Sequence, residues 1–490
     1  MRIRSSAPAG TGTGYTPATT PAPNGIQYLG FYSGGATPAA TLGPPRIDTK
    51  ADIGKGWDDI INTIGQKGDG VHQQLGFFVG PIGWDLTDAQ LKQMIDDAFA
   101  LAEAKNVAVG FHIEDSMFWY NRTSLWSNNN NVEWSNWQGT IVPHRIIGWV
   151  GGGQPILAPP MCFNSPTITT EATRLARDVI GAQIKQNVDR LNAEGKGYLF
   201  MGVIAGWETR MQDDSQNPHV DYGYCALHNL GYSASNPPAD LHKALQGVVS
   251  NWVILWTKGL SDAGIPRGKI YTHTGALGES SCDASNGFCQ DAPPSVVFNS
   301  YSYPGFSVYG TQNFSSLYTL LGANSTTPWG VSEGTGTMLS SAYSTGGASN
   351  AASASMEQYL ASVFNHHGTY VDLFGWSKTS NDAFAKSTTG PSAILAYQKF
   401  LKGQALQESV AQAVSTTPST PCPSALPSGA PIGLSSMCTQ LKSAEQAGTI
   451  KYPFGPIQSV GMLNASVSDQ ISAGNYANAE AIIQLALSSK

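Results

Sequence analysis

Two glutamates in this sequence each stand at the end of a short apolar run. "YLFMGVIAGWE" (198–208) ends on Glu208, and "PWGVSE" (328–333) ends on Glu333. Cleavage of a glycosidic bond needs two carboxyl groups. One must protonate the leaving oxygen while the other stabilises or attacks the oxocarbenium-like carbon. The residue types therefore predict this chemistry, provided that the fold brings Glu208 and Glu333 to one place.

The neighbours of the two glutamates predict different pKa values for them. Trp207 can place an apolar wall beside Glu208 and raise its pKa. Ser332, together with the backbone amides of the small residues after Glu333, can donate hydrogen bonds to Glu333 and lower its pKa. Those small residues also leave room for a sugar ring. Two simpler interpretations stay open: a structural ion pair between Glu208 and Arg210, and an ordinary surface position for Glu333.

A third apolar run ends on a second group of reactive side chains. "VAVGFHIED" (107–115) contains His112, Glu114 and Asp115. One of the carboxylates can bind a sugar hydroxyl or itself be the acid, and His112 can line the site or be an ordinary hydrogen-bonded core histidine. We expect further substrate-binding roles for the following residues: Trp119, Trp207, His273, Tyr301, Tyr303 and Trp376.

Eight apolar runs supply the strands that must position these side chains. They are continuous rather than alternating, as expected for strands that are covered on both faces. The runs lie at 26–32, 74–80, 107–113, 198–206, 269–275, 295–301, 328–333 and 371–377, and helical patterns lie at 87–106, 169–195, 238–264 and 355–368. This alternation predicts an α/β fold, a (β/α)8 TIM barrel. A doubly wound open sheet is the alternative, but no G-x-G-x-x-G follows the first run.

Three segments lie outside this alternation. Residues 1–24 are predicted to be a disordered leader, 25–403 the catalytic barrel, and 404–490 a helical C-terminal appendage. A long insertion at 114–165, after the third strand, holds five of the twelve Trp residues, namely Trp119, Trp126, Trp134, Trp137 and Trp149. Flat indole rings stack on sugar rings, but they can equally pack together as a small core of the insertion itself.

The order of these elements resembles that of the clan A glycoside hydrolases. In that clan the glutamate after strand 4 is the acid/base and the glutamate at the end of strand 7 is the nucleophile, and the anomeric configuration is retained. The resemblance implies these roles for Glu208 and Glu333. The clan usually has Asn before the acid/base, where this chain has Trp207. An arrangement like that of the β-amylases also places acids after strands 4 and 7, but it inverts.

The resemblance also implies roles for residues around the pair. Tyr301 or Tyr303, near the end of strand 6, would steady the nucleophile. His112 would line the subsite for the sugar that is cleaved, and Trp376 would form its floor. We find no metal-ligand spacing among His, Asp and Glu residues, so we expect no metal and no cofactor.

The bulk composition favours a neutral sugar polymer as the partner. Charged residues make up 12% of the 490 residues and the net charge is −7. No long basic run is present, which argues against nucleic acid as a partner. The sequence also contains no run of about 18 apolar residues, so it predicts no membrane-spanning helix. Two rival functions use the same scaffold: a non-catalytic carbohydrate-binding barrel and a transglycosylase. The lack of a G-x-S-x-G motif counts against an esterase.

The six cysteines favour an oxidising compartment, so we expect a secreted or periplasmic protein. Two pairs are close in sequence, Cys282 with Cys289 and Cys422 with Cys438, and a third pair of Cys162 with Cys225 completes the set. Buried free thiols are the alternative.

Overall fold

The computed structural model describes most of the predicted barrel and part of the C-terminal region. The described residues are 25–37, 45–147, 156–211, 216–217, 221–275, 297–310, 314–322, 327–336, 355–380, 383–407, 430–450, 467 and 476–488. The chain divides into two compact units, residues 1–408 and residues 409–490.

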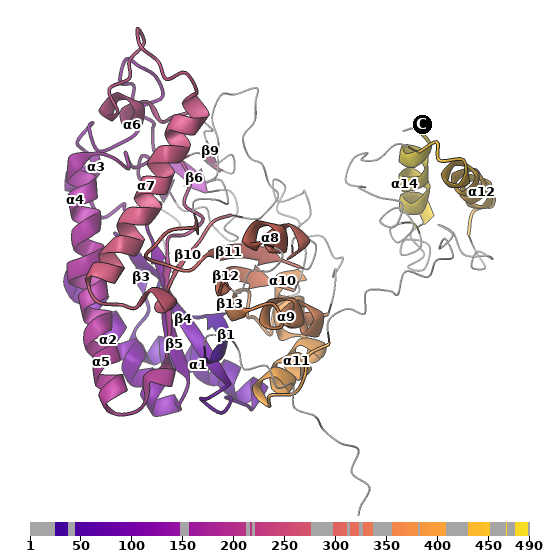
Figure 1. The fold of residues 1–490 in the computed structure, drawn as a ribbon, viewed down its shortest axis with the longest axis horizontal. Helices are drawn as coiled ribbons and strands as arrows, with labels where there is room; N and C mark the ends of the chain where they lie inside the picture. Colours follow the sequence, from indigo (N-terminus) through magenta and orange to yellow (C-terminus); the bar gives the residue numbers. More distant parts are fainter. Residues whose placement is uncertain are drawn as a thin grey trace, which may run out of the picture. The chain divides into compact units, whose positions relative to one another are not determined.

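The first unit is built around one sheet of eight parallel strands (Figure 1). These are β1 (Gln27–Tyr32), β4 (Gln73–Gly83), β5 (Ala108–Glu114), β8 (Phe200–Ala205), β10 (Ile270–Thr272), β11 (Gly305–Tyr309), β12 (Trp329–Thr335) and β13 (Gly368–Leu373). Their order in the sheet is β10-β8-β5-β4-β1-β13-β12-β11. Parallel bridges from Tyr271 to Tyr303 and from Thr274 to Phe306 bring the two outer strands together. The fold is therefore a (β/α)8 barrel, which confirms the prediction from the apolar runs.

Helices surround the barrel in Figure 1. They include α1 (Lys50–Ile64), α2 (Asp88–Lys105), α4 (Pro166–Arg174), a π-helical segment η1 (Leu175–Gly181), α5 (Ala182–Ala193), α7 (Leu241–Asp262), α8 (Phe314–Leu321), α9 (Met356–Phe364), α10 (Ala383–Thr389) and α11 (Pro391–Leu401). Local capping defines several starts: Thr49, Thr87 and Ser355 each form a capping box at the first turn of α1, α2 and α9.

The sixth strand lies further along the chain than the sequence predicts, so the prediction of 295–301 is wrong. The part of "SVVFNSY" that the structure describes, from Val297, ends in a turn. The side chain of Asn299 accepts hydrogen bonds there from the backbone amides of Tyr301 and Ser302. Such an Asx turn competes with strand pairing. The strand is instead "GFSVY", β11, all five residues of which are buried.

Smaller elements lie within the insertion after the third barrel strand and in the segment that follows β8. β6 (Arg145–Ile147), β7 (Ile156–Leu157) and β9 (Gln216–Asn217) form a three-stranded sheet, with α3 (Thr123–Trp126) and α6 (Tyr224–Asn229) nearby in sequence. A disulfide between Cys162 and Cys225 ties the end of the insertion to α6, as predicted. β2 (Ala36–Thr37) and β3 (Arg46–Ile47) form a separate two-stranded sheet.

The second unit contains two described helices, α12 (Ile432–Gln446) and α14 (Tyr476–Ser488), which share a small apolar core. Cys438 in α12 is disulfide-bonded. The predicted partner Cys422 and the pair Cys282–Cys289 lie outside the described residues, as does Trp149. Within the described part of the chain, no helix has the length and apolar character needed to span a membrane.

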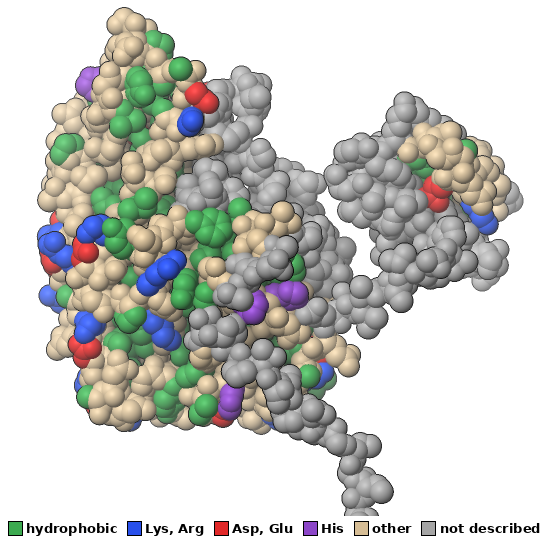
Figure 2. Space-filling view, in the orientation of Figure 1, with side chains coloured by type: hydrophobic (Ala, Val, Ile, Leu, Met, Phe, Trp, Pro, Cys, Tyr) green, Lys and Arg blue, Asp and Glu red, His purple; other side chains and the backbone are tan. Residues whose placement is uncertain are grey.

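Charged side chains on the visible face of the first unit are few and scattered. Figure 2 shows Lys and Arg side chains next to Asp and Glu side chains, without a broad area of one sign among the described residues. Ion pairs within helices of this unit include Lys258 with Asp262 and Lys185 with Asp189. This surface fits the low charged fraction of the sequence.

Candidate active site

Glu208 and Glu333 lie together at the end of the barrel where the strands finish. Glu208 follows β8, Glu333 lies in the second half of β12, and each side chain is 18% exposed. One carboxylate oxygen of each, together with a ring nitrogen of His273, lies within 4.8 Å of the others. The fold thus brings together two acids that are far apart in the sequence.

Glu208 has an unusual backbone conformation. Its φ is +47°, in the left-handed region that only a few per cent of non-glycine residues adopt. Its Oε1 accepts a hydrogen bond of 2.5 Å from the hydroxyl of Ser307, and its Oε2 lies 3.3 Å from a guanidinium nitrogen of Arg210. Strained backbone of this kind is concentrated at functional sites. The ion pair with Arg210 that the sequence left open is present, but it is only one of the carboxylate's contacts.

Asp115 holds the backbone turn that carries Glu208. Its carboxylate accepts hydrogen bonds from the amide of Trp207 (3.2 Å), the hydroxyl of Thr209 (2.7 Å) and the indole of Trp252 (2.9 Å). The carboxylate is therefore occupied with positioning the loop after β8, and a direct contact with substrate does not follow from its geometry.

Glu114 has a similar structural use. Its carboxylate accepts hydrogen bonds from the three consecutive backbone amides of Ser116, Met117 and Phe118. Burial, with a further contribution from Asp115, raises the pKa of Glu114 to about 8. Glu114 therefore shapes the start of the insertion.

The surroundings of Glu333 raise its pKa. Burial, and next the negative charge of Glu208, raise the pKa of Glu333, while the Tyr309 hydroxyl and the Trp207 side chain oppose the rise. Tyr309 donates to Oε1 at 3.0 Å. The predicted lowering by Ser332 is wrong, because the Ser332 hydroxyl contacts the Thr272 carbonyl and the Tyr370 hydroxyl instead.

Two buried histidines lie next to the pair of glutamates. His112 stacks on the ring of Trp207 with 4.8 Å between ring centres, and its Nε2 lies 3.0 Å from Nδ1 of His273. His273 Nε2 lies 2.7 Å from the Ser307 hydroxyl and 4.0 Å from Glu333 Oε2. Burial lowers the pKa of both histidines, so both rings are neutral near pH 7.

Two of the predicted aromatic residues lie away from the glutamates, so the roles expected for them need correction. Tyr303 pairs with the start of β10, and its ring packs on Tyr271. Tyr301 precedes the strand and lies by Lys258. Both were placed wrongly because the sixth strand was placed too early in the chain, and the tyrosine that contacts Glu333 is Tyr309.

Trp376 also lies elsewhere. Its indole donates to Asp59 of α1 at 2.9 Å, and its ring packs edge-on against Phe31. It does not form the floor of the site. The strand ends at Leu373, three residues before Trp376, so the indole has left the barrel and lies against α1.

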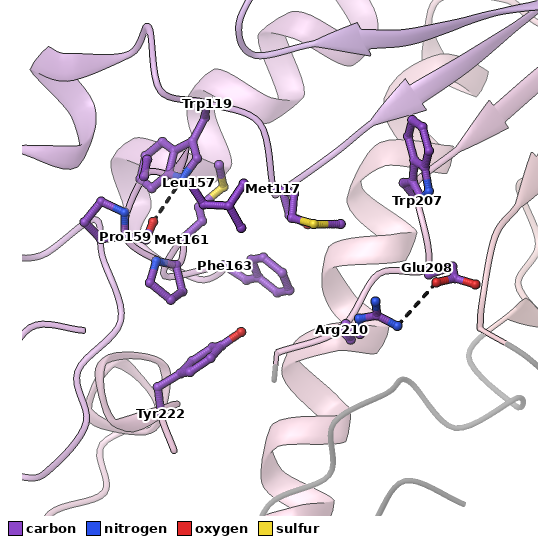
Figure 3. Close-up of a pocket in the computed structure, with 13 residues that line it drawn as sticks. Met117, Trp119, Leu157, Pro159, Met161, Phe163, Trp207, Glu208, Arg210 and Tyr222 are labelled. Atoms are coloured by element: carbon purple, nitrogen blue, oxygen red, sulfur yellow. Dashed lines mark hydrogen bonds and ion pairs between the residues drawn. The ribbon is translucent and has the colours of Figure 1, made fainter. Parts of the chain in front are cut away.

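A pocket adjoins Glu208 on the side of the insertion (Figure 3). Its space, part of which is open to solvent, measures about 450 Å³. Trp119 contributes to its wall, and the indole donates to the Pro159 carbonyl at 3.0 Å. Most of the lining residues that Figure 3 labels are apolar, while Glu208 and Arg210 lie at one side of the pocket. The labelled apolar side chains are Met117, Trp119, Leu157, Pro159, Met161, Phe163 and Trp207.

The sequence reasoning missed Ser307, Tyr309 and Asp372. Each is a polar residue inside or at the end of an apolar strand, in "GFSVY" and "GTYVDL". A polar side chain at a buried strand position needs a hydrogen-bond partner, and this was the available signal.

His273 and the two glutamates are donor types that can ligate a metal. However, His273 directs one ring nitrogen toward His112 and the other toward Ser307. The described residues of this cluster therefore fit a hydrogen-bonded acid pair better than a metal centre.

No protein-family model matches the sequence, and no curated protein matches it. Among solved structures, the catalytic domain of a β-amylase from Paenibacillus polymyxa is similar, with a TM-score of 0.41 and 10% identity over 77% of this chain and 99% of that chain. A GH5-4 broad-specificity endoglucanase from an uncultured bacterium has a TM-score of 0.38 and 10% identity over 81% and 97%. A GH5 family lichenase from Caldicellulosiruptor sp. F32 has a TM-score of 0.37 and 9% identity over 81% and 100%. Similarity at this level does not by itself assign a reaction to the chain.

Proposed function

We propose that the barrel unit is a retaining glycoside hydrolase in which Glu208 is the acid/base and Glu333 is the nucleophile. The short separation of the two acids carries this proposal: an oxygen of each lies within 4.8 Å of the other. Retaining enzymes hold their carboxyl groups about 5–5.5 Å apart, whereas inverting enzymes need about 6.5–9.5 Å to admit a water molecule.

The two steps require different protonation states: Glu333 must be ionised, against the rise in its pKa, and Glu208 must carry a proton. Glu333 attacks the anomeric carbon as a carboxylate, while the neutral Glu208 donates its proton to the glycosidic oxygen and the leaving group departs. Glu208, now a carboxylate, then removes a proton from water, which attacks the glycosyl ester and releases Glu333. Esterification removes the negative charge of Glu333, which faces Glu208 in the free enzyme.

The pocket beside Glu208 is the proposed subsite for the leaving group. Glu208 protonates the leaving oxygen, so the leaving group lies on the Glu208 side of the cleaved bond. Glu208 lines this pocket, and Glu333 is not among the described lining residues. The apolar wall supports a neutral sugar face or an apolar aglycone there, within an oligo- or polysaccharide or a glycoside.

An oxidising compartment, outside the cell or in the periplasm, is the proposed location. The disulfide between Cys162 and Cys225 supports it, because such bonds persist mainly in oxidising compartments.

The stereochemistry of the first product tests the mechanism. A panel of α- and β-linked 4-nitrophenyl glycosides identifies a substrate, and proton NMR then records the anomer of the released sugar before it mutarotates. We expect the anomer of the substrate. The opposite anomer would replace the retaining mechanism by an inverting one, and no hydrolysis of this panel or of neutral polysaccharides would refute the proposed activity.

A further inference from the structure

A row of polar side chains leads from Glu208 to a third acid, the buried Asp372. Ser307 lies 2.5 Å from Glu208 Oε1, and His273 lies 2.7 Å from Ser307. His112 lies 3.0 Å from His273, and Asp372 Oδ2 lies 3.4 Å from His112 Nδ1. The chain crosses the barrel, because its members come from the strands or strand ends of β8, β11, β10, β5 and β13.

The interior members of this chain are shielded from solvent. Asp372, His112 and His273 are each 1% exposed, and Ser307 is fully buried. Within the described part of the chain, neither His112 Nδ1 nor Asp372 Oδ1 has a hydrogen-bond partner. Among the described residues His112 Nδ1 thus makes no hydrogen bond, and its 3.4 Å contact with Asp372 Oδ2 is the link that must shorten before a proton can cross. Because an unpaired buried polar group is costly, both groups favour that approach.

The order of donors and acceptors permits two arrangements with the same number of protons. In the first, Asp372 is neutral and donates to His112 Nδ1, His112 Nε2–H donates to His273, His273 Nε2–H donates to Ser307, and the Ser307 hydroxyl donates to the Glu208 carboxylate. In the second, every proton has moved one bond along the chain, which leaves Asp372 ionised and Glu208 neutral. Both histidines are neutral in each arrangement.

We propose that His112, His273 and Ser307 let Asp372 and Glu208 share one proton, so that the catalytic acid draws on a buried proton store. The inference rests on the proposed role of Glu208. Four steps move the proton: Asp372 to His112 Nδ1, His112 Nε2 to His273 Nδ1, His273 Nε2 to Ser307, and Ser307 to Glu208. One proton leaves Asp372 and one reaches Glu208, and no other reactant is needed. His112, His273, Ser307 and Asp372 are positioning residues, since they act through Glu208.

The charges around both ends favour keeping this proton. Glu208 faces the following groups: Glu333, His273, Ser307 and Arg210. Asp372 faces the following groups: Glu333, His112, Tyr32, Tyr359 and Tyr370. The Gly206 carbonyl faces both imidazoles. Because Glu333 faces both acids, its negative charge disfavours a state in which Asp372 and Glu208 are both ionised.

The consequence is an extended alkaline limit of activity. Two coupled acids lose their two protons in well separated steps as the pH rises. Between these steps the pair shares the remaining proton, so a fraction of Glu208 stays neutral until the second step. The carboxamide of Asp372→Asn cannot supply a proton. Glu208 is then the only acid of the pair, and it ionises without a shared proton to keep part of it neutral. The alkaline limb of kcat/KM should therefore move to lower pH, by about one unit if the two acids are coupled as strongly as proton sharing requires.

A double-mutant cycle separates proton sharing from simple charge repulsion. The pH profile of kcat/KM is measured with the best 4-nitrophenyl glycoside for wild type, Asp372→Asn, Ser307→Ala and the double variant. We expect the shift caused by Asp372→Asn to fall to less than about a third of its size once Ser307 is replaced, because the chain is then broken. An undiminished shift would overturn the proposal. Ser332→Ala removes a buried hydroxyl outside the chain and should leave the Asp372→Asn shift intact.

A measurement that does not use activity completes the test. In ¹⁵N-histidine NMR of the full chain, each transfer converts His112 and His273 together, so the two rings should show the same ratio of Nδ1–H to Nε2–H forms. Both ratios should change in Asp372→Asn. Rings with different, fixed tautomers that ignore Asp372→Asn would refute proton sharing even if every variant were inactive. Coupled tautomers in a chain without glycosidase activity would refute only the proposed function.

Discussion

Each candidate catalytic residue is defined by what surrounds its carboxyl group. Glu208 accepts from Ser307 and lies beside Arg210, whereas Glu333 accepts from Tyr309 and lies 4.0 Å from His273. The proposed reaction needs a proton donor and an anion in one site at the same pH, so the role of each acid is tested separately. The resulting assignment makes separate predictions for each acid.

Glu208→Gln should remove the proton donor while leaving the nucleophile in place. For a poor leaving group such as an alkyl alcohol, kcat/KM should fall by about 10²–10⁴-fold, the usual contribution of general acid catalysis. For a 2,4-dinitrophenyl glycoside the loss should be much smaller, because this leaving group departs without a proton. Equal losses for both substrates would contradict the role of Glu208. Glu103→Gln, at a helical ion pair, is the control and should change neither rate.

Tyr309→Phe should make Glu333 harder to ionise. The Tyr309 hydroxyl donates to the Glu333 carboxylate and lowers its pKa, so its loss raises that pKa further. Attack requires the ionised form, and the acidic limb of kcat/KM should therefore move to higher pH, by about one unit for a hydrogen bond to a charged group. Tyr303→Phe, at the other end of the strands, should leave the limb unchanged. If the acidic limb of the Tyr309→Phe profile stays at the same pH or moves to lower pH, the hydroxyl does not act on Glu333.

At the scale of elements, the loop ends of β5 and β8 fix where Glu208 stands. Asp115 accepts from three donors in and around the turn that contains Trp207 and Thr209, and Glu114 accepts three consecutive amides at the start of the insertion. Both acids hold the backbone in place. Burial of their carboxyl groups makes the free energy of unfolding depend on pH.

Glu114→Gln should flatten the dependence of thermal stability on pH. Glu114 keeps its proton in the folded protein up to about pH 8, whereas in the unfolded chain it ionises near pH 4.3. Between these values the folded state binds the extra proton, so this group makes stability fall as pH rises. The melting temperature of wild type should therefore drop more between pH 5 and 8 than that of Glu114→Gln. An equal or steeper drop in the variant would show that Glu114 is ionised when folded.

Sequence reasoning located most barrel strands because they are buried on both faces and therefore continuously apolar. It failed at the sixth strand, where "SVVFNSY" has the composition of a strand but Asn299 turns the backbone. That error moved the expected tyrosine from Tyr309 to Tyr301 and Tyr303. The left-handed backbone of Glu208 and the chain through Ser307 to Asp372 depend on contacts between distant strands, which one sequence does not encode locally.

At the scale of the whole molecule, the barrel unit explains the proposed reaction through its topology. Parallel strands direct all their carboxyl ends to one rim, so acids far apart in the sequence meet there. The second unit, residues 409–490, has its own small core of α12 and α14. The described residues on the visible face of the first unit carry few charged side chains in Figure 2, which supports the proposal of a neutral rather than a polyanionic substrate.

The most direct test of this account is whether a glycosyl group becomes covalently attached to Glu333. The full chain would be incubated with the 2-deoxy-2-fluoro glycosyl fluoride of whichever sugar is hydrolysed fastest as its 4-nitrophenyl glycoside. The intact mass and the labelled peptide would then be measured. We predict the mass increase of one fluoroglycosyl group on the peptide that contains Glu333, and none in Glu333→Gln. A label on another carboxylate, or rapid turnover of the ordinary glycoside without any trapped ester, would contradict the assignment.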